Sequence, residues 1–196
     1  MAETREALIA AGLEEFGKNG LDAPSLDGIC ARAGFTRGAF YIHFRDRDDF
    51  ITAVMDRALR SFFDVIFSPR GAENLLETVR RFQKALESGG SALPFNAAVP
   101  LYRIVEACRR SLLIRERFAW HIADAQSRLA GAARAGQRDG SLRTDVNADQ
   151  LAAMLISAAF GEMSVAEAGV PIDAQTGGDI IGVLVRAPGA KRAGRR

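Results

Sequence analysis

Apolar residues recur every three or four positions along most of this chain, and this period constrains the fold more than any other feature of the sequence. No segment shows the sustained alternation of apolar and polar residues, bounded by turn dipeptides, that is typical of a half-buried strand. The sequence therefore predicts an all-α protein with about nine helices.

Local signals place the ends of these helices. Ser25, Thr36 and Asp46 are suited to begin helices, because their side-chain oxygens can accept a hydrogen bond from the first free backbone N–H groups. Gly20 and Gly34 are suited to end helices in the left-handed conformation. We expect helices at about 4–17, 26–33, 37–44, 46–67, 73–87, 100–108, 112–136, 147–169 and 173–186.

The composition is that of an ordinary globular chain, with 48% hydrophobic and 26% charged residues. No apolar run is long enough to cross a membrane, and the first residues lack the pattern of a signal peptide, so we expect a cytoplasmic protein without membrane contact. Cys30 and Cys108 stand far apart, without the spacing of a disulfide framework or a zinc site. We interpret both as small core residues.

The net charge of +2 is weak evidence for a nucleic-acid partner. The segment from Arg186 onward carries five basic residues and no acid, so the remainder of the chain has a net charge of 2 − 5 = −3. A DNA site must therefore be a local patch. Such a patch exists between Cys30 and Arg47, where four arginines face the single acid Asp46.

The segment from Ser25 to Arg47 predicts two short helices joined by a tight glycine turn. This unit is the helix-turn-helix, which places its second helix in the major groove of DNA. The predicted outward face carries hydrogen-bonding side chains that suit phosphates or base edges, and a glycine that would let a DNA backbone come close. The predicted DNA-binding residues are Ser25, Thr36, Arg37, Gly38, Tyr41, His43 and Arg47.

The string Thr36-Arg37-Gly38-Ala39-Phe40-Tyr41-Ile42-His43-Phe44, followed by Arg45-Asp46-Arg47, resembles the DNA-binding domain of the tetracycline-repressor (TetR) family. The resemblance covers about residues 4–60. It implies that Tyr41 and His43 clamp phosphates and that Thr36 and Arg37 approach bases or phosphates.

Two positions depart from the pattern of that family. Arg47 takes the place of the family's usual lysine at the start of the fourth helix. Ile42 replaces the aromatic or polar residue often found between the tyrosine and the histidine; if it touches bases, it would prefer a thymine methyl group. The role of Ile42 stays open.

The resemblance also implies the partners of the protein. These are a double-stranded DNA operator, a small-molecule effector and a second copy of the chain, bound through the last two long helices. Two recognition helices on a near-palindromic operator must reach successive major grooves, which makes a homodimer necessary. The expected division is a helix-turn-helix domain at 1–48, an effector-binding and dimerisation domain at 49–187 and a basic disordered tail at 188–196, with the helix at 46–67 connecting the first two.

The second domain carries a surplus of large apolar or amphipathic residues on helices separated by loose loops. A helical bundle can enclose a small-molecule pocket lined in this way, although plain core packing explains any single residue as well. The candidate ligand-binding residues are Phe95, Tyr102, Phe118, Trp120, His121 and Met154. The identity of the effector, the operator sequence and the regulated genes stay open.

Two other classes of function were weighed against a transcriptional regulator. An enzyme has little support, because the chain has only His43 and His121, and no Gly-rich phosphate loop, GxSxG or HExxH motif. We therefore expect no catalysis, no cofactor and no metal site. The alternative is a ligand-binding or scaffolding helical protein without specific DNA binding, against which the intact basic patch argues.

Overall fold

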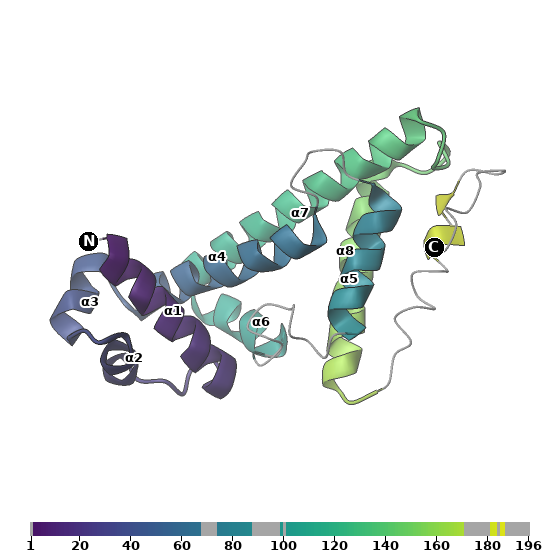
Figure 1. The fold of residues 1–196 in the computed structure, drawn as a ribbon. Coiled ribbons are helices and arrows are strands. Elements are labelled where there is room, and N and C mark those ends of the chain that lie inside the picture. The colour runs from purple at the N-terminus through teal and green to yellow at the C-terminus, as the bar shows by residue number, and fades with distance from the viewer. Residues whose placement is uncertain are drawn as a thin grey trace. The chain divides into compact units, whose positions relative to one another are not determined.

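The computed structural model describes residues 2–67, 74–87, 99, 101–170, 181–183 and 185–186. Its labelled helices are α1 (Ala2–Asn19), α2 (Leu26–Ala33), α3 (Arg37–His43), α4 (Arg47–Ile66), α5 (Leu75–Glu87), α6 (Leu101–Arg110), α7 (Leu112–Arg138) and α8 (Ala148–Glu167) (Figure 1). No strand occurs in the described ranges, where Leu142 and Arg186 form one isolated antiparallel bridge. The predicted all-α class is confirmed.

The last predicted helix, at 173–186, lies largely outside the described residues, as does the predicted tail at 188–196. Within that helix, Ile181, Gly182 and Val183 are helical. The part that this helix was expected to play in dimer assembly stays a prediction.

Side chains cap the helices around the predicted helix-turn-helix as the sequence indicates. Ser25 Oγ, Thr36 Oγ1 and Asp46 Oδ1 each accept a hydrogen bond from the backbone N–H three residues later, at 3.0, 3.3 and 2.8 Å respectively. Gly34 ends α2 with φ +77°, a conformation that favours glycine. These local caps fix both ends of α2 and the start of α3.

Helix α1 is longer than the predicted 4–17, because Lys18 and Asn19 continue it. The helix ends at Gly20, as predicted. Gly20 has φ +76° and donates its N–H to the Phe16 carbonyl at 2.9 Å. Asn19 also donates its side-chain amide to Glu15 at 3.0 Å, which supports the extra turn.

Four phenylalanine rings form a core that holds α1, α3 and α4 together. Phe16, Phe40 and Phe50 are fully buried and Phe44 is 3% exposed. Phe50 lies at the centre, with its ring centroid 5.8, 5.2 and 4.9 Å from those of the other three. Gly12 permits this approach, because a Cβ there would lie only 2.6 Å from Phe50 Cζ. The core therefore fixes α3 against α1 and α4.

The predicted inward face of the helix-turn-helix is largely as expected. Ile29, Phe40 and Phe44 are buried, whereas Leu26 and Phe35 are half-buried.

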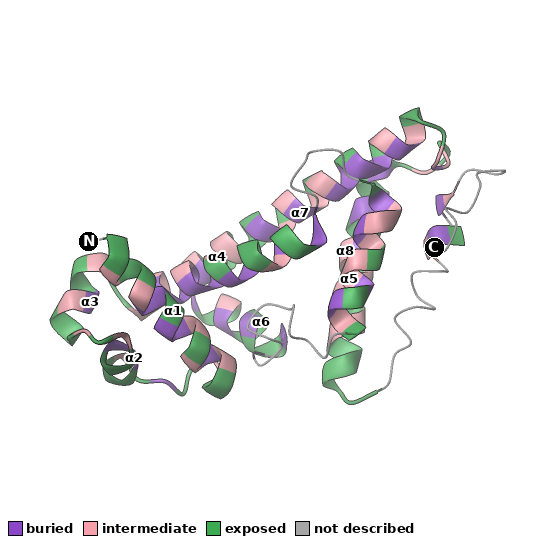
Figure 2. Cartoon of the chain, in the orientation of Figure 1, coloured by how far each residue is buried: buried purple, intermediate pink, exposed green. Residues whose placement is uncertain are grey.

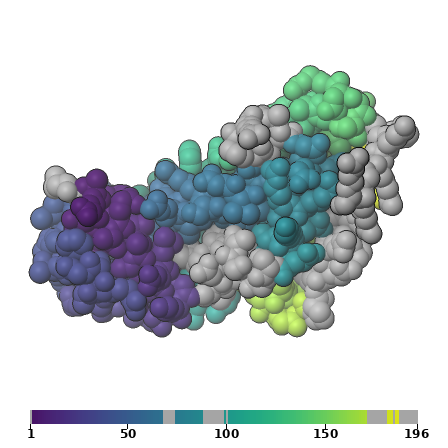
Figure 3. All heavy atoms as spheres, in the orientation of Figure 1, coloured from purple at the N-terminus to yellow at the C-terminus, as the bar shows by residue number. Residues whose placement is uncertain are grey.

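The chain divides into two compact units. One contains residues 1–64 and 88–121, and the other contains residues 65–87 and 122–196. Helices α1, α2 and α3 belong to the first unit, where their purple and blue-violet spheres adjoin (Figure 3). Helices α4 and α7 contribute residues to both units. The predicted domains at 1–48, 49–187 and 188–196 were defined by their expected functions, whereas the two compact units are defined by packing. The predicted division therefore stays a prediction.

Helix α8 has an open side that is exposed along its length, whereas its buried residues lie only in its first half; its C-terminal end is green in Figure 2. Met154 and Val165 are 46% and 40% exposed. Small residues on the same helix, Ser157 and Gly161, are exposed as well. The buried residues are Ala148, Leu151, Ala152 and Leu155.

Candidate nucleic-acid interface

Five of the seven predicted DNA-contact residues lie on α3 or at its N-terminal end, whereas Ser25 is the N-cap of α2 and Arg47 is the first residue of α4. Thr36 is the N-cap of α3 and Arg37 is its first residue. Both are exposed, as are Gly38 and Tyr41, while His43 at the last position of the helix is half-buried. The Tyr41 ring packs edge-on against the buried Phe40, with centroids 5.4 Å apart, and the residue Tyr41 as a whole is 49% exposed. A buried core thus presents an exposed polar face.

Gly38 leaves that face of α3 open to close approach, and Ile42 lies exposed on the same helix. A Cβ on Gly38 would meet only Thr36 Oγ1, at 3.6 Å, which is ordinary contact. The folding of the protein without DNA therefore does not require glycine at position 38. Ile42 is 70% exposed, a high value for a large apolar side chain.

Arg37 is held at the junction of α2 and α3. Its Nη1 lies 3.4 Å from Asp27 Oδ2, and its Nη2 donates to the Tyr41 hydroxyl at 3.4 Å. The guanidinium carbon is 5.8 Å from the centroid of the Tyr41 ring. The hydrogen bond to Tyr41 and the charge of Asp27 raise the pKa of Arg37, which is therefore a permanent cation.

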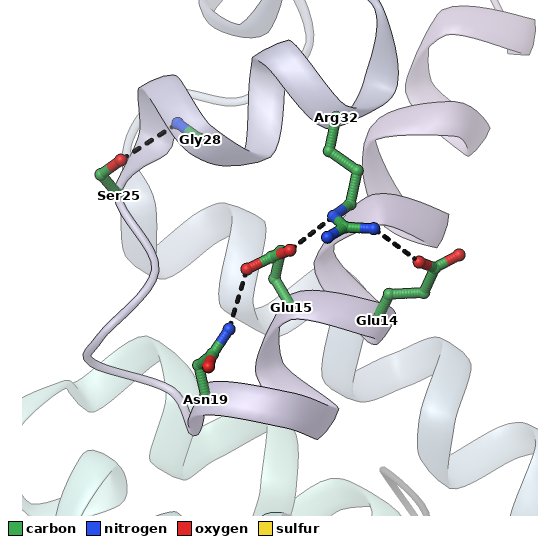
Figure 4. Close-up of polar contacts among 6 residues, drawn as sticks. All are labelled: Glu14, Glu15, Asn19, Ser25, Gly28 and Arg32. Carbon is green, nitrogen blue, oxygen red and sulfur yellow. Dashed lines mark hydrogen bonds and ion pairs between the residues drawn. The ribbon is translucent and has the colours of Figure 1, made fainter.

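Arg32 is directed away from α3 and toward α1. Its Nε bonds Glu15 Oε1 and its Nη1 bonds Glu14 Oε2 at 3.0 Å (Figure 4). The same view shows Ser25 capping Gly28 at the opposite end of α2. Arg32 thus joins α1 to α2 and adds little free charge to the predicted basic patch, because two carboxylates already neutralise it.

Arg47 has backbone partners that sequence reasoning missed. Its Nη1 donates to the Pro24 carbonyl at 2.8 Å and its Nη2 to the Leu21 carbonyl at 2.6 Å. Its guanidinium carbon also lies 5.9 Å from the Phe16 ring centroid. The side chain is half-buried and anchors the loop between α1 and α2. Its predicted contact with a phosphate stays a prediction.

Arg45 is the most exposed of the four arginines, with a side chain that is 75% exposed. Its Nε lies 3.8 Å from Asp49 Oδ2, and its backbone N–H donates to the same oxygen at 3.0 Å. A pair this exposed contributes little to stability. Arg37 and Arg45 are therefore the arginines of the patch whose side chains are mostly exposed.

Cys30 lies buried on α2. Burial, helped by the charge of Asp27, raises the pKa of its thiol, although Arg37 acts in the opposite direction. The thiol is therefore protonated near neutral pH, in keeping with the packing role that the sequence predicts.

This arrangement lies within the segment that matches a known family. The family model described as "Bacterial regulatory proteins, tetR family" matches residues 8–54. Residues 8–54 are therefore similar to the DNA-binding domain of TetR-family regulators. The resemblance that the sequence indicated is confirmed.

A curated relative is similar to a part of the chain of comparable length. The HTH-type transcriptional repressor BepR of Brucella suis biovar 1 is 42% identical over 57 residues, which cover 29% of this chain and 27% of BepR. The match thus spans about a quarter of the length of the curated relative.

Solved structures are similar to nearly the whole chain. The reduced form of Escherichia coli NemR has a TM-score of 0.76 at 18% identity, covering 94% of this chain and 99% of NemR. The complex of Stenotrophomonas maltophilia SmeT with triclosan has a TM-score of 0.69 at 20% identity, covering 98% of this chain and 96% of SmeT. At these identities the likeness concerns the fold, and it bears out the predicted helical second domain.

The predicted effector residues differ in how far they are buried, and their part in binding an effector stays a prediction. Tyr102, Trp120 and Met154 are 58%, 51% and 46% exposed. Phe118 is half-buried on α7, and Phe95 lies outside the described residues.

His121 is the one member of the effector set that is fully buried in the described chain, at 1% exposure. Its Nε2 lies 2.7 Å from Asp56 Oδ1 on α4, and the same oxygen accepts from Arg117 Nε at 2.6 Å. Burial alone would raise the pKa of Asp56, but the hydrogen bonds from His121 and Arg117 outweigh it and lower that pKa to about 2. His121 therefore already has an ionised partner within the chain.

None of the described helices is both long and apolar enough to cross a membrane. Among the described residues, no group of three or more His, Cys, Asp or Glu side chains could hold a metal ion.

Proposed function

We propose that this chain is a sequence-specific DNA-binding transcriptional regulator of the TetR type. The observation that carries this proposal is the exposed polar face of α3, with Thr36, Arg37 and Tyr41, fixed on an aromatic core in the segment that matches the family. Helix-turn-helix proteins read base edges with the N-terminal residues of such a helix, while flanking side chains hold phosphates.

The proposed direction of regulation is repression, relieved by a small apolar or amphipathic ligand. BepR is named a repressor, and SmeT is described as the repressor of a multidrug efflux pump. The triclosan complex of SmeT supports an effector of this chemical class. The effector contacts proposed from the sequence remain Phe95, Tyr102, Phe118, Trp120, His121 and Met154. We further propose a cytoplasmic protein without catalytic activity.

The proposed homodimer uses the open side of α8. Met154, Ser157, Gly161 and Val165 recur at helical spacing along that side and are exposed. Small residues let a second helix approach closely, and the larger apolar residues then gain burial. Sedimentation analysis should find a dimer that Val165→Glu weakens. Val105→Glu on α6 is the matched control, since Val105 is similarly exposed, at 45%.

Binding to duplexes that carry an inverted repeat from the DNA upstream of the coding region tests the proposed function. We expect the full chain to prefer this DNA over a scrambled duplex by at least about 10³-fold, as specific regulators do. Arg37→Ala should reduce that preference by about 5- to 150-fold, the worth of one good base contact.

Arg57→Ala is the matched control for Arg37→Ala. Arg57 lies on α4 and pairs with Glu6, and its side chain is 51% exposed against 54% for Arg37. It should leave the preference unchanged. Absence of sequence preference on this duplex and on a library of random duplexes would overturn the proposal and favour the ligand-binding or scaffolding protein. Protection from thermal unfolding by triclosan, the first probe to use, would then still report an effector site.

A further inference from the structure

An exposed acidic residue of the helix-turn-helix lies beside Arg37. Asp27 belongs to the first turn of α2, and its side chain is 69% exposed. It is ten residues from Arg37 along the chain, yet its Oδ2 lies 3.4 Å from Arg37 Nη1. The pair therefore connects the two helices of the motif at the point where α3 begins.

Asp27 is not needed to cap its helix. Ser25 Oγ already accepts the Gly28 N–H at 3.0 Å. A carboxylate in the first turn gains only a small, screened interaction with the helix dipole. An exposed carboxylate beside a DNA-contact arginine also opposes phosphate binding, because it repels the phosphates that dominate affinity. Its place beside Arg37 calls for a role other than raising affinity.

The geometry around Arg37 suits the reading of a base. Asp27 and Tyr41 hold Nη1 and Nη2 from two sides, both at 3.4 Å. A guanidinium has five N–H donors, so about three remain, and a guanine takes two through O6 and N7. Holding the long side chain in advance reduces the conformational entropy that it would lose on binding. Both contacts are longer than a normal hydrogen bond, so they favour one orientation of the side chain and still let it adjust on DNA.

The other arginines of the patch lie outside α3, and Arg45 among them pairs with Asp49. Arg32 is bound to α1 through Glu14 and Glu15, and Arg47 is bound to two backbone carbonyls. Arg37 is the arginine on α3 itself, and it has a carboxylate partner supplied by the preceding helix.

We propose that Asp27 is a positioning and specificity-determining residue. It holds the Arg37 side chain in the orientation that contacts a guanine in each operator half-site, and its negative charge weakens binding to the phosphates of non-specific DNA. This inference rests on the proposed function. It predicts opposite effects of one substitution on two kinds of binding. With Asp27→Asn, specific binding weakens because Arg37 is no longer held, while non-specific binding strengthens because a negative charge is removed.

Selection from a library of random duplexes by the full chain tests the proposal. The wild type should recover an inverted repeat with a guanine at one position per half-site. Asp27→Asn and Arg37→Ala should both lose preference at that same position, by about fivefold or more. Asp27→Asn should also bind a non-specific duplex more tightly, with a salt slope steeper by about one. Asp27→Glu, which keeps the charge, should retain the wild-type slope.

Glu14→Gln is the matched control, because it removes one exposed carboxylate from an arginine pair in the same domain while Glu15 still holds Arg32. It should leave the guanine preference unchanged. An Asp27→Asn selection identical to that of the wild type, or a parallel loss of specific and non-specific binding, overturns the role of Asp27 alone. A wild type that selects no sequence overturns the proposed function and this inference together.

Discussion

His121 on α7 and Asp56 on α4 form a buried hydrogen bond of 2.7 Å between Nε2 and Oδ1. The side chain of His121 is 2% exposed and that of Asp56 is 20% exposed. Arg117, one turn earlier on α7, donates to the same oxygen. Two donors from α7 thus converge on one carboxylate of α4, and both helices depend on its charge.

Asp56→Asn should therefore destabilise the protein in a pH-dependent way. The hydrogen bonds from His121 and Arg117 lower the pKa of Asp56 from 3.8 to about 2, against the effect of burial. A carboxyl group with a lowered pKa stabilises the fold above its unfolded pKa and loses that contribution as the pH falls through its folded pKa. Urea unfolding should show a deficit of about 2 kcal/mol at pH 7 that shrinks between about pH 4 and pH 2.

Asp22→Asn provides the comparison for Asp56→Asn. Asp22 pairs with Arg110 at 2.9 Å, but both side chains are about half exposed. Its loss should change the unfolding free energy by less than about 0.5 kcal/mol. Equal stability of Asp56→Asn and wild type at pH 7 would show that the α4–α7 contact contributes nothing.

Gly12→Ala should be strongly destabilising, because the new methyl group has no room. Its Cβ would lie 2.6 Å from Phe50 and 2.8 Å from Val54, both buried side chains. Overpacking of this kind costs about 1–3 kcal/mol. Gly131→Ala on α7 is the control, since nothing lies within 4 Å of its added Cβ. It should stabilise the helix by about 0.5–1 kcal/mol. Thermal unfolding of the two variants should therefore shift in opposite directions.

Thr36→Ala should lower the stability of the protein even in the absence of DNA. Its hydroxyl accepts the Ala39 N–H at the start of α3, and loss of such a cap costs about 1 kcal/mol. Thr36→Ser keeps the cap and should retain wild-type stability in chemical denaturation. If DNA binding falls with alanine but recovers fully with serine, the hydroxyl rather than the methyl group matters. Equal destabilisation by serine and alanine would rule out the capping role.

The sequence predicts the helix-turn-helix well because its determinants are local. Ser25, Gly34 and Thr36 each act within four residues, so their caps can be recognised without knowing the fold. The exposed face of α3 then follows from helical periodicity once Phe40 and Phe44 are assigned to the core.

Contacts between distant parts of the chain could not be predicted in this way. Asp56 and His121 are 65 residues apart, and the arginine at 47 reaches carbonyls 23 and 26 residues earlier. Periodicity reveals which residues are apolar but not which helix faces which. For the same reason Tyr102 and Trp120, expected to line a pocket, are about half exposed in the single chain.

Arg47 anchors the loop between α1 and α2 and is also predicted to contact a phosphate, and one pair of substitutions separates these two roles. The guanidinium bonds the carbonyls of Leu21 and Pro24 through two separate nitrogens, and a lysine, whose three donors share one nitrogen, does not reproduce this forked geometry. Arg47→Lys keeps the charge near the start of α4 but loses this double contact. We therefore expect Arg47→Lys to lose about 1–2 kcal/mol of unfolding free energy, as for one or two hydrogen bonds.

DNA binding then distinguishes the two roles. If Arg47 also contacts a phosphate, Arg47→Ala should flatten the salt slope by about one relative to Arg47→Lys, because only alanine removes the charge. If Arg47 serves the loop alone, the two variants should share the same slope and differ only in stability. Since the loop leads directly into α2, an anchoring role would still affect DNA binding, through the placement of Ser25 and the helix it begins.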